Sequence, residues 1–413
     1  MWTRPFATLF VLNILLYCGV DMPLSAMPLY LKLNGAGAGE IGALFGFVYA
    51  SSILARVSAG PLSRKVGELC PLYLSFVAAA AGCFVFISHD GFLVYLASRI
   101  LFGLGFGAGS TFLIVLASRS MPPARLAEGL GALAFGATVA LSFSPYVGQR
   151  ITDYYGFSTM LFFVGLLQAL GLAAALTFSR SDFPETASAP ARASGEAGEG
   201  GPPSAETGRP RRGKGARGAA WTTVAIVSIL TLLLGGASAG IFSFLVLFLD
   251  ERGVPGAPRF FLAVTCGIAV TRILGGRLSD RFGHLCVIVP SSLLMTMSFV
   301  WLFFIPEAFR SIPAAVMFGL GLGSLHPALQ ALALSEIPGS LRFAAAASLL
   351  NGYDVGIALS TFALAAAVSQ TGSYRCVYWA AAAMTALLLA LYLTSPTLRA
   401  VRTGGRERLQ GGA

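Results

Sequence analysis

Charged residues are scarce in this chain: they make up 11% of its 413 residues, whereas hydrophobic residues make up 56%. Soluble globular domains carry about 25% charged residues. A surface with so few charges cannot face water on every side. The composition therefore excludes an ordinary water-soluble enzyme or binding module.

Metal ligands and nucleophiles in recognisable patterns are also missing. The six cysteines show no CxxC spacing, and the chain has three histidines. We find no nucleophile–base pair, no metal cluster and no phosphate-cradling loop of recognisable spacing. The sequence predicts no catalytic residue, no metal site and no cofactor, so we expect a protein that is not an enzyme.

Long apolar runs are abundant instead. About 20 apolar residues cross a bilayer as a helix, and lipid offers no partner for an unpaired backbone amide. We therefore expect membrane-spanning helices rather than strands. Counting gives twelve spans, at residues 6–31, 40–61, 71–88, 92–116, 128–149, 157–178, 220–249, 258–277, 286–305, 311–335, 343–369 and 375–395.

Lysine and arginine are distributed unevenly between the two sides of these spans. With the N-terminus inside, 19 of the 28 lie on the inner side, 6 on the outer side and 3 within spans. The positive-inside rule then predicts a multi-pass protein with both termini in the cytoplasm. This bias also explains the net charge of +10 without a nucleic-acid partner, since no soluble domain presents a basic face.

One segment has a different composition. Residues 181–219 are rich in Gly, Pro, Ser, Ala and Glu, and Phe183 is their only large apolar side chain. Such a stretch buries too little surface to offset its ordering entropy, so we predict a disordered cytoplasmic linker. It divides the chain into a six-helix bundle at 1–180, a second at 220–395 and a cytoplasmic tail at 396–413.

The two bundles repeat each other at one constant offset. The stretch "RVSAGPLSRKVG" at 56–67 returns as "RILGGRLSDRFG" at 272–283, and Phe102–Gly105 returns as Phe318–Gly321, both 216 residues later. An even number of spans puts both copies in the same orientation. We predict an all-α membrane protein with twelve transmembrane helices, arranged as two parallel six-helix repeats around a central cavity.

The repeated polar hairpin resembles the G-x-L-x-D-R-x-G signature of the major facilitator superfamily. The second copy fits it fully, whereas Arg64 takes the Asp position in the first. The resemblance implies a cytoplasmic gate in which the Asp meets a helix N-terminus of the other half. The implied gate residues are Gly60, Arg64, Gly67, Gly276, Asp280, Arg281 and Gly283.

Two further stretches resemble the drug:proton antiporter-like branch of this superfamily. Arg99, followed by small residues, is similar to a motif of proton-coupled members. Ser144-Pro145-Tyr146-Val147-Gly148 is similar to the exporter motif G-P-x-x-G, with Ser in place of the first Gly. The resemblance also implies a monomer in a bacterial inner membrane.

Three charged residues lie well inside the expected spans: Asp21, Arg99 and Asp354. An ionisable residue at this depth is costly and is a functional candidate. We expect all three to take part in proton coupling. Asp21 and Arg99 lie at similar depth and could form an ion pair. We favour a role of this pair in proton coupling, and a purely structural salt bridge is the alternative.

The remaining polar residues of the spans are sparse, and aromatic residues are plentiful. A cavity of this kind suits a small amphipathic organic molecule better than a sugar phosphate, although the aromatic side chains can equally serve packing. The expected cavity residues are Asn13, Phe106, Phe143, Phe242, His326, Gln330, Asn351 and Tyr353.

These observations favour a proton-coupled secondary active transporter that exports a small amphipathic organic compound by alternating access. Its partners are the substrate, protons and the lipid bilayer. A proton symporter that imports a metabolite would share every feature of the fold. A non-transporting membrane receptor or scaffold is a third alternative.

Overall fold

The computed structural model describes residues 2–121, 125–183, 214–254, 256–282, 284–304, 311–335 and 342–398. These residues form thirteen α-helices and one short 3-10 helix, η2 at Arg180–Asp182. The helices are α1 (Arg4–Asp21), α2 (Pro23–Leu33), α3 (Ala38–Val66), α4 (Leu69–Ser88), α5 (Phe92–Arg119), α6 (Leu126–Tyr155), α7 (Phe157–Ala175), α8 (Lys214–Glu251), α9 (Ala257–Phe282), α10 (Leu285–Phe304), α11 (Ser311–Ser335), α12 (Arg342–Thr371) and α13 (Arg375–Thr394).

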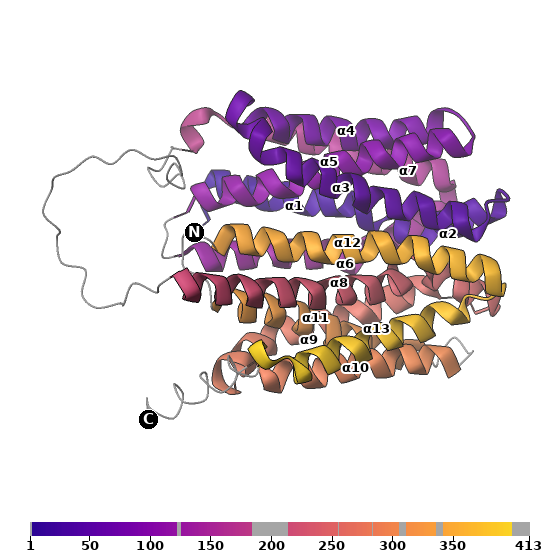
Figure 1. The fold of residues 1–413 in the computed structure, drawn as a ribbon. Helices are drawn as coiled ribbons and strands as arrows, with labels where there is room; N and C mark the ends of the chain where they lie inside the picture. The colour runs from indigo at the N-terminus through magenta and orange to yellow at the C-terminus, as the bar shows by residue number, and fades with distance from the viewer. Residues whose placement is uncertain are drawn as a thin grey trace, which may run out of the picture.

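All these helices run roughly along one axis, as Figure 1 shows. The start of α1 and the end of α13 lie at one end of the bundle, which we call the linker end because α7 also ends and α8 also begins there. The other end, where α2 finishes and α3 begins, is called the far end. Successive spans therefore cross the bundle in opposite directions, with α1 and α2 forming one span.

The helices confirm a multi-pass membrane protein. In the described ranges, eleven helices are long and apolar enough to cross a bilayer, and a shorter apolar stretch, Ala257–Thr271, lies in α9. Together these twelve segments match the twelve expected spans. The first span, Arg4–Leu33, consists of α1 and α2.

The first span is interrupted at Met22–Pro23. Proline has no backbone N–H and its ring crowds the carbonyl four residues earlier, so Pro23 breaks the helical hydrogen-bond ladder. Met22 keeps helical backbone angles, and the chain continues in the same direction into α2. Asp21 is the last residue of α1, directly before this break.

The packing of small residues confirms the repeat. A Cβ at Gly103 would collide with the Val48 carbonyl, and a Cβ at Gly319 would collide with that of Val264. Both the glycines and their partners are 216 residues apart. Gly105 and Gly321 contact Ser75 and Ser291 at the same offset, and Gly107 and Gly323 contact Ser52 and Ile268. Equivalent helices therefore approach each other equally closely in both halves.

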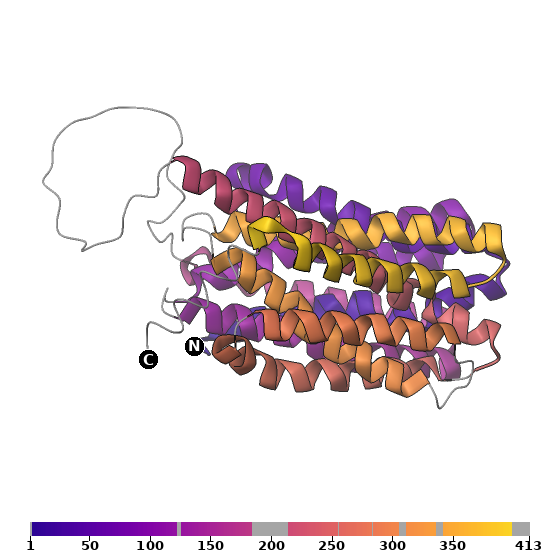
Figure 2. The same cartoon turned by 60° about the horizontal axis from the view of Figure 1, so that its bottom comes forward.

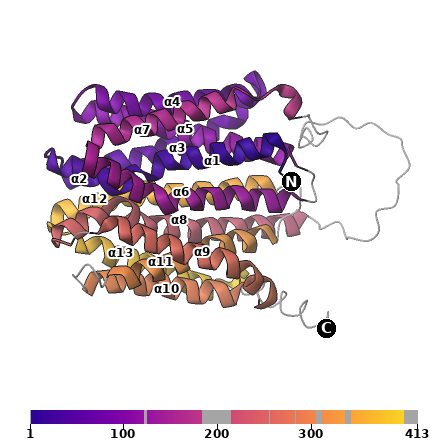
Figure 3. The ribbon, with the colours of Figure 1, turned by 180° about the vertical axis from the view of Figure 1, so that it is seen from behind.

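The two halves pack side by side through three pairs of helices. α3 contacts α12, α6 contacts α9 and α2 contacts α8. Figure 1 shows α12 between the halves on one face, and Figure 3 shows α6 and α9 on the opposite face. Figure 2, turned from the first view, shows the two bundles running alongside each other over their whole length.

Contacts between the halves concentrate toward the far end. Gly42 of α3 packs tightly against Ala365 of α12, and the rings of Phe47 and Phe362 lie 5.3 Å apart. Every residue of α8 from Leu234 to Leu249 is buried. In contrast, from residue 53 to the end of α3 only Ala59 is buried. The halves are thus closed against each other at the far end.

The expected linker at 181–219 is structured at both margins. Phe183 is buried, with its ring 5.1 Å from that of Phe178. The helix α8 already begins at Lys214, six residues before the expected start of the second bundle. The intervening residues 184–213, and the tail beyond residue 398, lie outside the described residues. Apolar packing of Phe183 therefore overrides the composition signal at the first margin.

Candidate functional site

A buried ion pair joins the two halves in the middle of the bundle. The Arg56 guanidinium of α3 donates to the Asp354 carboxylate of α12 through Nη1. Their side chains are 14% and 10% exposed. Arg56 lies ten residues before the end of α3 and Asp354 twelve residues after the start of α12, about 15 and 18 Å from the linker end. Equal depth on adjacent helices allows this pairing.

Polar and aromatic side chains surround this pair. Ser52 lies one turn before Arg56, and its hydroxyl is 3.5 Å from the Asp354 carboxylate. Arg56 Nη2 lies 3.4 Å from the Ser110 hydroxyl of α5, and its guanidinium carbon lies 5.9 Å from the Phe106 ring centre. Phe106 meets Tyr17 of α1 edge-on at 5.3 Å. Four spans therefore converge on the pair.

Three of the predicted cavity residues lie together beside the Arg56–Asp354 ion pair. His326 and Gln330, one turn apart on α11, are joined between their Nε2 atoms at 3.3 Å. The His326 ring lies 4.9 Å from that of Tyr353, the neighbour of Asp354 on α12. Tyr49 of α3 lies within electrostatic range of both Tyr353 and Asp354. The His326–Gln330–Tyr353 group thus adjoins the ion pair.

Asp21 lies buried near the same region without a partner. It is 6% exposed, and its Oδ2 makes no hydrogen bond within the described residues. Tyr17, one turn earlier on the same face of α1, lies within electrostatic range of Asp21, Arg56 and Asp354. Asp21 therefore faces the junction of the halves.

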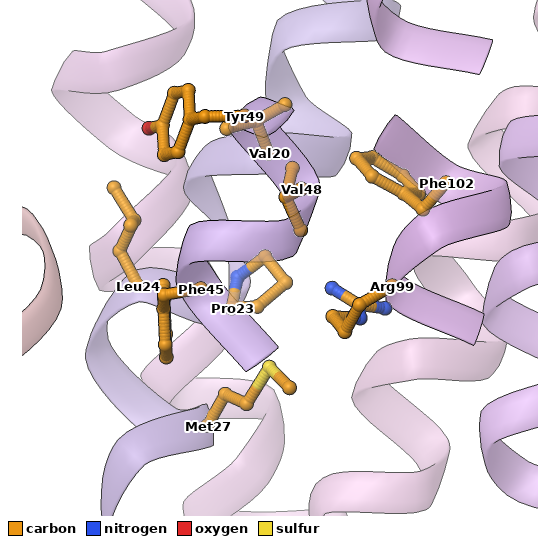
Figure 4. A pocket seen from close by; sticks show the side chains of 9 residues that line it. All are labelled: Val20, Pro23, Leu24, Met27, Phe45, Val48, Tyr49, Arg99 and Phe102. Carbon is orange, nitrogen blue, oxygen red and sulfur yellow. The ribbon is translucent and has the colours of Figure 1, made fainter. Parts of the chain in front are cut away.

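Arg99 points elsewhere, as Figure 4 shows. Its side chain is 4% exposed and lies between the rings of Phe86 and Phe102, at 5.4 and 5.3 Å. It borders a cavity of about 20 Å³ enclosed by α1, α2, α3 and α5. The Arg99 Nε and Nη2 atoms have no hydrogen-bond partner in the described chain. The volume holds about one water molecule.

The structure therefore corrects the expected Asp21–Arg99 ion pair: the two side chains face different spaces. Val20, Leu24 and Met27 share the helix face that borders the Arg99 cavity. Asp21 is turned about 100° from Val20 around the axis. Similar depth in the membrane is thus not enough for pairing, since the helix faces must also match.

Of the four other predicted cavity residues, three lie away from this centre or in packing roles, and Asn351 lies near the ion pair. Asn13 is buried and donates to the Leu133 carbonyl of α6 at 2.8 Å, which ties α1 to α6. Phe242 packs against Phe318 within the second half. Phe143 is 60% exposed. Asn351 lies one turn before Asp354, and its Oδ1 is buried without a hydrogen bond in the described part of the chain.

The first gate signature ends α3 at the linker end. Gly67 has a φ of +77°, which favours glycine, and its N–H bonds the Ser63 carbonyl. Gly60 and Arg64 are exposed, and no ion pair of Arg64 occurs among the described residues. The side chains of Gly276, Asp280 and Arg281, and all of Gly283, lie outside the described residues.

The exporter-like stretch of α6 packs against the break in the first span. The Pro145 carbonyl accepts a hydrogen bond from the Ser25 hydroxyl at 2.6 Å. Gly148 leaves room for the Met22 carbonyl, which a Cβ would strike. The Ser144 hydroxyl lies 3.2 Å from the Cys18 sulfur. The motif therefore secures the backbone on either side of Asp21.

Sequence reasoning missed Arg56, Ser52, Tyr17 and Tyr49 as site residues. Arg56 opens the repeated hairpin stretch, and its place near the cytoplasmic end of the expected span set it apart from the charges deeper inside. The available signal was an arginine eleven residues before the closing glycine in both copies, deep enough to enter the bundle. Its partner depends on how the halves meet, which no single span reveals.

Known proteins share both the sequence pattern and the fold. The profile described as Major Facilitator Superfamily matches residues 9–361. The uncharacterized MFS-type transporter YhhS of Escherichia coli (strain K12) is 24% identical over 397 residues, which cover 92% of this chain and 89% of YhhS. The uncharacterized MFS-type transporter YuxJ of Bacillus subtilis (strain 168) is 22% identical over 344 residues, covering 80% and 83%.

Solved structures agree with this fold. A POT family transporter in complex with a thioalcohol-conjugated peptide superposes with a TM-score of 0.73 at 14% identity, over 96% of each chain. The nucleoside transporter NupG gives a TM-score of 0.69 at 13% identity, over 95% of this chain and 98% of NupG. At such identities these two structures show the fold alone. With the profile spanning most of the sequence, the chain belongs to the major facilitator superfamily and is a membrane transporter rather than an enzyme.

Proposed function

We propose that this transporter is a proton-coupled secondary active carrier that exports a small amphipathic organic compound by alternating access. The observation that carries the proposal is the buried Asp21 carboxylate, whose Oδ2 has no partner in the described residues. An uncompensated anion inside a bundle is costly. A proton on this oxygen removes the charge, so Asp21 supports a site that takes up and releases protons.

Alternating access requires a bundle that opens at one end while it closes at the other. The contacts between α3 and α12 at the far end, and the exposed second half of α3, support such an arrangement. With the termini placed in the cytoplasm by the positive-inside rule, the far end faces outward. The described conformation then corresponds to a carrier closed toward the outside of the inner membrane.

The side chains that meet between the halves support a partly aromatic substrate. Phe106, Tyr17 and Tyr353 supply apolar ring surface, while His326 and Gln330 supply hydrogen-bonding atoms. Few polar groups among many aromatic ones suit a compound with an apolar body and one or two polar groups. We propose that a monomer carries out this cycle.

Import by proton symport is the second candidate, and the Arg56–Asp354 pair favours it. A proton on Asp354 would end the pairing and leave the Arg56 charge available to a bound anion. Proton and substrate would then bind together, as symport requires. The two candidates differ in whether protons move in the same direction as the substrate or in the opposite direction.

Transport by inside-out vesicles tests the proposal. A pH gradient imposed across vesicles that contain the protein should drive the accumulation of members of a panel of cationic, neutral and anionic aromatic compounds. Asp21→Asn should abolish pH-driven accumulation and keep energy-independent exchange, because the amide keeps the shape but carries no exchangeable acidic proton. Asp153→Asn, a matched change of an exposed carboxylate on α6, should transport normally.

Full pH-driven transport by Asp21→Asn would refute the role of Asp21. Accumulation of a compound that moves in the same direction as the protons would support import by symport in place of export. Absence of movement for every compound of the panel, with the protein folded in the vesicles, would count against the proposed substrate class.

A further inference from the structure

We propose that Arg56 binds the carboxylate of an organic anion and that Asp354 releases Arg56 for this purpose when it takes a proton. The inference rests on the proton-coupled transport proposed above but not on its direction. It assigns a substrate class, a small monocarboxylate with an aromatic or apolar body, and places its charged group at the contact between α3 and α12.

The surroundings of Arg56 fit the recognition of a carboxylate. A guanidinium offers a planar fork of N–H donors that matches two carboxylate oxygens, and in the described state one arm of this fork, Nη1, donates to the Asp354 carboxylate. The Ser52 hydroxyl lies near the same carboxylate at 3.5 Å, and the Ser110 hydroxyl lies 3.4 Å from Nη2. Asp354 therefore marks the place where a substrate carboxylate would sit.

Arg99, the other arginine in the interior of the described bundle, cannot serve this purpose. Arg99 borders an enclosed space of about 20 Å³, lined by apolar side chains such as Leu24, Met27 and Phe45. That space holds about one water molecule and no organic ion. Arg56, by comparison, lies between the two halves, where relative movement of the halves changes the space around it.

Ring surface beside Arg56 provides a place for the body of the anion. Phe106 lies 5.9 Å from the guanidinium, and Tyr17 meets Phe106 edge-on. On the other side of Asp354, Tyr353 packs with His326. A carboxylate attached directly to an aromatic ring would place its charge on Arg56 and its ring among these side chains.

Proton and anion are coupled because both act on one ion pair. The titratable and charged groups around Asp354 are Arg56 and Tyr49 on α3, Tyr17 on α1, its own neighbour Tyr353 and, next to the Tyr353 ring, His326 on α11. α8 packs against α12 at this depth through Gly235 and Gly236, and its residues 221–249 include no charged side chain. Protonation of Asp354 leaves Arg56 uncompensated, and a bound carboxylate restores neutrality. Each ligand therefore strengthens the binding of the other.

Three probes of one shape test the inference on the purified full-length protein. Benzoate, benzamide and benzamidine share a benzene ring and differ in charge. Binding is measured by thermal stabilisation and by calorimetry at about pH 5.5 and about pH 8, where benzoate is an anion at both values. We expect benzoate alone to bind, at least about tenfold more tightly at the lower pH, since a charge-assisted pair is gained.

Variants separate an anion site from a merely structural ion pair. Asp354→Asn should bind benzoate at about pH 8 as tightly as the wild type does at about pH 5.5, which is a gain that a structural role does not predict. The double variant Arg56→Gln with Asp354→Asn is neutral and should remain folded, but it should bind no benzoate. Arg150→Gln removes an exposed cation of α6 and should behave like the wild type.

The inference is overturned if folded wild-type protein does not bind benzoate at either pH, if the double variant still binds it, or if Asp354→Asn gains no affinity at about pH 8. Preferred binding of benzamidine would instead assign the site to cations that displace Arg56 from Asp354. These results are independent of the vesicle assay. Proton-driven transport of other compounds without benzoate binding would leave the proposed function intact and remove only this substrate class.

Discussion

The two halves of the molecule share their packing but few of the charges within their spans, of which only Arg56 recurs, as Arg272. The glycines that let helices approach each other, such as Gly103 and Gly319, recur with equivalent partners 216 residues apart. At the same offset, Asp21 and Arg99 correspond to Ala237 and Ala315, and Asp354 corresponds to Thr138. Each half must pack six helices, so the close contacts are needed twice. One set of charges at the junction is enough for one site, and each buried charge is costly.

Breaking the ion pair across the halves should have the largest effect on stability. Asp354→Ala leaves the buried Arg56 charge without its partner, which costs about 3 kcal/mol. Arg56→Gln together with Asp354→Asn removes both charges and should recover most of this loss. The thermal unfolding midpoint of the detergent-purified protein measures both changes.

A midpoint in Asp354→Ala equal to that of the wild type would mean that water already compensates Arg56. The pair would then not be a buried contact in the ground state. A double variant as unstable as the single one would point to lost packing rather than to an uncompensated charge.

The duplicated glycines should show smaller and equal effects in the two halves. Gly103→Ala and Gly319→Ala each put a methyl group against a backbone carbonyl of the neighbouring helix, at a cost of about 1–3 kcal/mol. Gly131→Ala is the control, because no atom lies within 4 Å of its Cβ position, and a helical Ala is favoured over Gly. Thermal unfolding midpoints of the three variants provide the comparison.

Equal losses at Gly103 and Gly319 would confirm that the repeat is energetic as well as geometric. A loss in one half alone would show that the halves do not contribute equally to folding, despite their matched contacts.

The sequence was sufficient for the fold because membrane helices depend on local composition. The twelve apolar segments and the offset of 216 are both visible without coordinates, and Gly103 and Gly319 confirm the offset in three dimensions. The packed start of the linker was not visible, since it depends on the tertiary contact between Phe183 and Phe178.

The site was only partly predictable, because pairing depends on helix faces and on the junction of the halves. Depth along the span correctly indicated that Asp21, Arg99 and Asp354 are buried. It gave the wrong partner for Asp21, because the helical rotation of α1 turns Asp21 away from the face that borders the Arg99 cavity. The partner of Asp354 comes from the other half, so no spacing within one half could indicate it.

The smallest effect is expected at the far end, where a second ion pair also joins the halves. Lys32 Nζ at the end of α2 lies 2.6 Å from the Asp250 carboxylate of α8. These side chains are 41% and 39% exposed, so water and salt screen the pair, and Asp250→Asn should cost about 0.2–1 kcal/mol. Thermal unfolding will barely register such a change.

The equilibrium between a closed and an open far end is a more sensitive measure of the Asp250→Asn change, because the Lys32–Asp250 pair forms only while the far end is closed. Losing it should raise the population open at the far end by at most about fivefold. Spin labels at Leu33 and Arg259, both exposed at this end, report the distance across the halves in a cysteine-free background. Asp250→Asn and raised salt should both increase the long-distance fraction, and the exchange Lys32→Asp with Asp250→Lys should reverse the effect of the single change. Identical distance distributions in all of these samples would show that apolar contacts such as Gly42 against Ala365 close the far end without help from this ion pair.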